Sequence, residues 1–189
     1  MDEVIKKARE MRAKFCMQAS GGIRNPVRLN TAKFSKFVSE DLGINITEQF
    51  LPEDEMPDLL GLYAKDNKGD VIILISEGNN HCWRRFVFIK ELCLAFLEET
   101  PCTDVEGLAS SLIYKDIKQQ NGNYAREVSG VIAAIEILIP EQLQGYLAHE
   151  TNVKRVDSTT LAERLMVPQR FLDFRLRTWG LPVIHAPAK

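Results

Sequence analysis

The segment Phe86–Leu97 reads FVFIKELCLAFL and is apolar except for Lys90 and Glu91, which stand side by side near its middle. A helix that is apolar nearly all round is buried, so this segment predicts a central helix of the fold. A buried charge without a partner is too costly to persist, so both residues need partners or shifted pKa values. The segment therefore predicts a core helix that carries a polar feature inside it.

A second apolar segment, at 124–138, has the same property. It contains VIAAIEILI, in which Glu136 is the single charge, and it stops before Pro140. The simplest arrangement is that the two helices cross and that Lys90 forms a buried ion pair with Glu136. The alternative is that each helix exposes a narrow stripe on which these charges are solvated.

The other periodic segments predict further helices and a small sheet. Ile44 and Ile46 alternate with polar residues and suggest a strand, and the runs LLGLYAK and VIILIS, joined by DNKG, predict a β-hairpin. Between 100 and 123 we expect a loop, a helix and a turn. The apolar spacing expected of a helix recurs at 2–19, 31–42, 140–149, 158–165 and 168–178. The fold class is therefore α+β, with helices around a small sheet.

Composition bounds the class of protein. The chain has 189 residues, 45% of them hydrophobic, and a net charge of -2, which gives no overall bias toward nucleic acids or membranes. The four cysteines have no CxxC spacing, and the charged start MDEVIKKARE has no apolar core of a signal peptide. The longest apolar runs are shorter than the roughly 20 residues that span a bilayer. We therefore expect a reducing, cytoplasmic setting.

Several short motifs, in a fixed order, give a likeness to a known family. They are Pro26-Val27, Leu42-Gly43-Ile44, Arg84-Arg85-Phe86, Glu127, the run Glu136 to Pro140, and LAERLMVPQRFLDFRL. In this order the chain resembles, over residues 25 to 180, the ImmA/IrrE family of zinc metallopeptidases. The resemblance implies a zincin-like core at 1–142, a small helix-turn-helix-like C-terminal subdomain at 143–180 and a tail at 181–189.

The chain differs from that family at the residues that bind the zinc ion. The family's HExxH motif places two imidazoles one helical turn apart to bind zinc, and the glutamate between them activates the metal's water. The matching positions here read Lys90-Glu91-Leu92-Cys93-Leu94, so a lysine and a leucine replace the two histidines. Glu91 stays at the position of the general base, and the resemblance places Glu136 at that of the third ligand. Leucine and an ammonium offer no lone pair to a metal, so we expect a vestigial site without zinc.

The resemblance implies a function as well. ImmA/IrrE proteins control partner repressors in bacteria and phages, so we expect a catalytically inactive relative that binds a protein, either a repressor-type regulator or an active relative. A second hypothesis is a zinc-dependent endopeptidase with atypical ligands, His81, Cys93, Glu91 and Glu136. A third is a DNA-binding regulator. In the last case the basic C-terminal helices would contact phosphates or an acidic partner through Arg170, Arg175 and Arg177.

Overall fold

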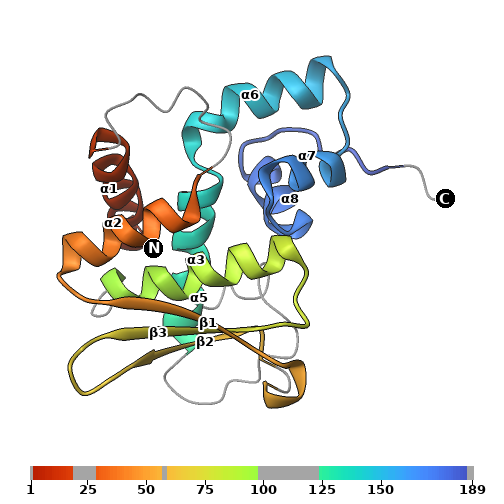
Figure 1. Ribbon diagram of the computed structural model, residues 1–189. Helices are drawn as coiled ribbons and strands as arrows, with labels where there is room; N and C mark the ends of the chain where they lie inside the picture. The colour runs from red at the N-terminus through yellow and green to blue at the C-terminus, as the bar shows by residue number, and fades with distance from the viewer. Residues whose placement is uncertain (1, 19–28, 57–58, 98–123, 187–189) are drawn as a thin grey trace.

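The sheet that forms one side of the molecule has three strands, β1 (Ile46–Leu51), β2 (Gly61–Lys65) and β3 (Val71–Ser76), in the order β1-β3-β2 (Figure 1). It is seen in a computed structural model that describes residues 2–18, 29–56, 59–97 and 124–186. β2 and β3 form the predicted antiparallel hairpin, and β1 pairs in parallel with β3. β3 is therefore the central strand, and every second one of its residues is fully buried: Val71, Ile73 and Ile75.

The two apolar segments form the central helices, α3 (His81–Leu97) and α5 (Tyr124–Leu138). α3 packs on β2 and β3 with one side and against α5 with another. It begins five residues before the predicted apolar run, because the side chain of Asn80 accepts a hydrogen bond of 3.0 Å from the Trp83 backbone N–H. This cap adds a first turn, with His81 as its first residue.

The α3–α5 crossing depends on Gly130. A Cβ at this position would lie 3.1 Å from Cδ2 of Leu94 and 3.3 Å from both Cγ and the carbonyl oxygen of Lys90. The missing side chain therefore lets the backbones approach closely at the point where Lys90 and Leu94, one helical turn apart, face α5. This contact fixes which residues of α5 Lys90 is able to reach.

The predicted helices at 2–19 and 31–42 are α1 (Asp2–Gln18) and α2 (Thr31–Leu42). α1 packs against α5, and α2 lies near the start of the sheet. Asn30 caps α2, since its side chain accepts a hydrogen bond of 2.9 Å from the Lys33 backbone N–H. Gly43, with a φ of 66°, ends the helix in the left-handed conformation that glycine adopts without strain.

The described C-terminal part is helical. After a short 3-10 turn come α6 (Gln144–Ala148), a π-helical turn (His149–Val153), α7 (Ser158–Leu165) and α8 (Gln169–Thr178). This part shares one hydrophobic core with the rest of the described chain. The Phe171 ring, for example, stacks on the Phe86 ring of α3 with 3.9 Å between centroids.

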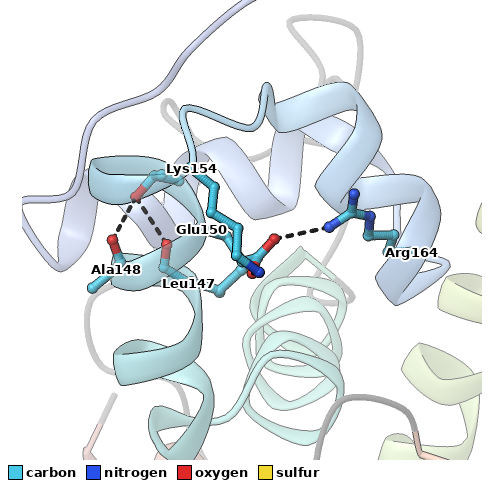
Figure 2. Close-up of polar contacts among 6 residues, drawn as sticks. Leu147, Ala148, Glu150, Lys154 and Arg164 are labelled. Carbon is cyan, nitrogen blue, oxygen red and sulfur yellow. Dashed lines mark hydrogen bonds and ion pairs between the residues drawn. The ribbon is translucent and has the colours of Figure 1, made fainter.

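Glu150 ties the π-helical turn to α7 (Figure 2). Its carboxylate side chain is only 3% exposed and lies 2.8 Å from Arg164 of α7 and 2.6 Å from Lys154 at the end of the turn. The hydrogen bond from Lys154 is the largest cause of a lowered pKa for Glu150, and Arg164 adds to it. The turn is thus held in place by charge.

The structure establishes a mixed α+β fold, with seven α-helices and three strands among the described residues. The features predicted for 100–123 lie outside the described residues. In the described part of the chain no single helix is long and apolar enough to cross a membrane, although the pair Ala125–Leu138 and Glu141–Val153, bent by 43°, meets those criteria together.

Candidate functional site

Lys90 lies at the α3–α5 crossing between two carboxylates. Its Nζ is 2.8 Å from Oε1 of Glu91 and contacts Oε2 of Glu127, which α5 supplies. The side chain of Glu91 is 2% exposed and that of Lys90 14%, whereas Glu127 is 36% exposed. These three residues, called the Lys90 cluster below, run from the buried interior to the surface.

The Lys90 cluster keeps its ammonium charged. Desolvation is the largest influence on Lys90 and alone would lower its pKa, but the charges of Glu91 and Glu127 and their hydrogen bonds outweigh it, so the pKa is raised. Burial raises the pKa of Glu91, against the opposing effect of the Lys90 charge. At neutral pH the cluster therefore holds a cation where two acids converge.

The predicted Lys90–Glu136 pair is wrong. Glu136 lies nine positions after Glu127, which is two and a half turns of helix, so the two carboxylates leave opposite sides of α5 about 13.5 Å apart along its axis. The face of α5 that meets α3 is marked by Gly130, and Glu127 lies one turn before it on this face. The solvated-stripe alternative fails as well, because Glu91 and Glu136 are each buried and paired.

Glu136 instead belongs to a second group, called the Glu136 cluster below, in which it is buried with Arg175 and meets the exposed Arg9. Its Oε1 is 2.7 Å from Nη1 of Arg175 on α8, and its Oε2 is 3.1 Å from Nε of Arg9 on α1. Nε of Arg175 also donates to the carbonyl of Ile139, at 3.1 Å. The cluster joins the first, central and last helices and is structural.

The three arginines predicted to contact phosphates or an acidic partner lie in different surroundings. Arg175 is buried and already paired with Glu136, so that part of the prediction is wrong. Arg170 places its guanidinium 4.5 Å from the ring centroid of Trp83 and 4.7 Å from that of Phe171. Arg177 is exposed near the end of α8. The three arginines therefore do not form one basic surface.

The atypical zinc ligands are not assembled. Cys93 is fully buried, where desolvation raises its pKa well above the usual value, and Glu136 is held by the two arginines. Leu94 occupies the position that faces Gly130 and has no donor atom. Within the described ranges, no group of three or more His, Cys, Asp and Glu side chains is placed to hold a metal ion. The donor set present does not fit zinc.

A pocket of about 540 Å³ lies away from the Lys90 cluster, between the start of α2, the first turns of α3 and one face of β1. His81 and Arg84 line it from α3, and Glu48 and Phe50 line it from β1. Beside them, Arg85 is buried and donates to the carbonyl oxygens of Leu29, Leu165 and Met166 at 2.9 to 3.1 Å. The rear wall of the pocket is thus rigidly held.

Two features of the site were not recognised as such in the sequence. Glu127 matches one position of a family motif, and its place three residues before Gly130, the one glycine of α5, is the sequence signal that puts it at the helix crossing. Arg9 carries no such signal, because it is one of several charges on an amphipathic helix. No protein-family model matches this chain, and no curated protein does either.

Proposed function

We propose that this protein is a catalytically inactive relative of the ImmA/IrrE metallopeptidases that acts by binding a protein partner. The observation that carries the proposal is the position of the Lys90 ammonium, which lies between Glu91 and Glu127 at the crossing of the two core helices. A side-chain cation there supplies the charge that a metal supplies in an active enzyme. The fold would then be a zincin-like scaffold whose chemistry has been replaced by an ion pair.

The corrected geometry strengthens the match to a vestigial site. In the family the third ligand comes from the helix after the hairpin and the HExxH helix, and the acid that α5 brings to Lys90 is Glu127. Glu127 thus takes the role that the sequence alone gave to Glu136. Lys90, Glu91, Leu94 and Glu127 then occupy the four positions at which an active enzyme would have two histidines, its general base and its third ligand.

A fold of this family without its zinc ligands would act by binding a partner protein. The resemblance points to a repressor-type regulator or an active relative of this protein. The partner would be held by a surface that no longer cuts it. Co-purification with a candidate repressor, without cleavage of that repressor, is the expected behaviour, and cleavage by the zinc-loaded wild-type protein would contradict the proposal.

Restoring the metal ligands tests the alignment directly. In the double variant Lys90→His, Leu94→His, two imidazoles one turn apart would join Glu127, and we expect about one zinc per chain by mass spectrometry of the purified, dialysed protein. The wild-type protein should hold none after the same treatment. Stoichiometric zinc in the wild type would overturn the proposal.

Two triple variants identify the third ligand. Adding Glu127→Gln to the double variant should release the zinc, whereas adding Glu136→Gln should leave the zinc content of the folded protein unchanged, because Glu136 lies on the other side of α5. Circular dichroism confirms that each variant is folded before its zinc is counted. Loss of zinc only with Glu136→Gln would show that α5 is rotated from the arrangement described above.

A further inference from the structure

β1 is exposed to a degree that is unusual for a strand in parallel pairing. Parallel strands are generally covered on both faces, yet Thr47, Glu48, Gln49 and Phe50 are all exposed, Phe50 to 45%. α3 covers β2 and β3, so β1 lies at the margin of the helical layer. No strand among the described residues pairs with its outer edge.

The register shows which backbone groups that edge presents. The carbonyls of Asn45 and Leu51 accept hydrogen bonds of 2.8 Å from the β3 side, from Val71 and Glu77. In a parallel pair, alternate residues direct both N–H and C=O toward the same neighbour. The odd-numbered residues of β1 therefore face β3, and Glu48 and Phe50 direct their N–H and C=O groups outward, ready for another strand.

The side chains of the same two residues line the pocket, so an added strand would project side chains into it. A residue paired with Glu48 would place its side chain beside that carboxylate. A residue paired with Phe50, two positions away, would come near Arg84, whose guanidinium lies 5.6 Å from the Phe50 ring centroid. Arg84 is fixed there by bonds to the carbonyls of Asn79 and Glu77 and has no carboxylate partner in the described part of the chain.

The α2 end of the pocket adds to this charge pattern. Asn30 caps the backbone N–H of Lys33, while Thr31 and Ala32, the first two residues of α2, line the pocket. A helix begins with partial positive charge, which favours an anion near it. One end of the pocket thus attracts an acid, and Glu48 attracts a base.

We propose that β1 is the docking edge for an extended segment of a partner protein that carries an acidic and a basic residue two positions apart. The segment adds a fourth strand to the sheet, its basic residue pairs with Glu48, and its acidic residue enters the pocket toward Arg84. This inference deepens the proposed protein-binding role and names the surface and the chemistry of the partner. It does not involve the Lys90 cluster.

A second copy of this chain fits the edge poorly. The sequence of β1, ITEQFL, contains no basic residue. Pairing two β1 strands would therefore leave Glu48 of each copy without a cation. In the antiparallel register that places the two Glu48 residues opposite each other, their carboxylates would also lie close together, which is destabilising. Charge complementarity thus favours a segment from a different protein.

The test uses four fluorescein-labelled heptapeptides with blocked ends: VTETKTV, VTKTETV, VTETETV and VTQTQTV. Fluorescence anisotropy with the full chain should show that one of the first two binds roughly tenfold more tightly than the glutamine peptide and the double-acid peptide. Which of the two orders binds reports whether the added strand is antiparallel or parallel. N-methylation of the peptide amides that face β1 should abolish binding.

A pair of protein variants isolates the edge. Glu48→Pro removes an outward N–H without removing a bond to β3, so it should abolish binding, whereas Glu48→Thr should retain binding and lose only the preference for the basic residue. Equal binding of all four peptides, binding that survives N-methylation, or no saturable binding to the wild type would each overturn the proposal. A wild-type dimer that Glu48→Pro dissociates would also overturn it, in favour of a second copy. The zinc content of the wild-type protein is measured separately, and it tests the proposed loss of catalysis whatever the peptide experiment shows.

Discussion

Lys90 and Glu91 are adjacent in the sequence, and adjacent residues of a helix point about 100° apart. They meet because the four-carbon chain of lysine bends its ammonium across to a carboxylate that is fixed in the interior. Glu127 holds the ammonium from the other side. The buried carboxylate is thus balanced by a residue that also reaches the surface.

Removing the ammonium should destabilise the fold strongly. In Lys90→Met, Glu91 stays buried without a cation, and we expect the free energy of unfolding to fall by about 3–5 kcal/mol. Lys90→Met combined with Glu91→Leu should recover most of this loss, because apolar side chains of similar volume then fill the site. Urea unfolding measures both, and a double variant no more stable than Lys90→Met would contradict the interpretation.

The sequence predicts that Lys90 and Glu91 need partners, because their apolar neighbours are visible in the sequence itself. It does not predict which partner, since Glu127 and Glu136 lie on the same helix and the choice depends on how α5 is rotated about its axis. That rotation is set by Gly130, whose contact with α3 is a tertiary fact. For the same reason, the sequence does not predict that Glu136 pairs with two arginines from distant helices.

At the scale of the elements, the crossing of α3 and α5 requires a residue without a side chain. Gly130 is buried there, whereas a Cβ on Gly145, in α6, would meet nothing within 4 Å. Both glycines are helical and neither has a positive φ. The two glycines are therefore alike in backbone conformation and differ in how closely their surroundings are packed.

Alanine substitutions should separate the two effects. Gly145→Ala should raise the free energy of unfolding by about 0.5–1 kcal/mol, the usual gain in helix propensity. Gly130→Ala gains the same term but forces α3 and α5 apart, and overpacking of about 1–3 kcal/mol should make it less stable than the wild type. Chemical denaturation measures both variants, and a stabilised Gly130→Ala would show that the helices separate at little cost.

The elements themselves differed in how well the sequence predicted them. The hairpin was visible because VIILIS is continuous and apolar and DNKG supplies a turn, which Asp66 closes with hydrogen bonds of 2.8 and 2.9 Å. The first strand was expected at Ile44 and Ile46 but runs from Ile46 to Leu51. Its polar residues are exposed on both faces, so it lacks the alternation that identifies a half-buried strand.

At the scale of the whole molecule, ion pairs connect helices that lie far apart in the sequence. The Glu136 cluster joins α1 and α8 to α5, and Glu150 joins the π-helical turn to α7. The pKa of Glu150 is lowered in the folded state, so its contribution to stability is present above its unfolded pKa, near 4.3, and is lost as pH falls through the lower folded value.

Acid should therefore remove the difference between the wild type and Glu150→Gln. We expect the variant to melt at a lower temperature at pH 7, and the two melting temperatures to converge as pH falls from about 4.3 toward 3. Circular dichroism melts at pH 7, 5, 4 and 3 measure this. Glu163→Gln, an exposed change on α7, is the control and should match the wild type throughout; a constant gap for Glu150→Gln at every pH would contradict the role given to its charge.

The strand order β1-β3-β2 also has a consequence for how the chain reaches its fold during synthesis. β1, the first of the described strands to leave the ribosome, has no sheet neighbour among them until β3 has followed, because β3 begins twenty residues after β1 ends. The hairpin is a local structure and is able to form as soon as residue 76 is free, whereas the parallel pairing must wait and close a longer loop. Of the three described strands, β1 is thus the earliest to be made and the last to be joined.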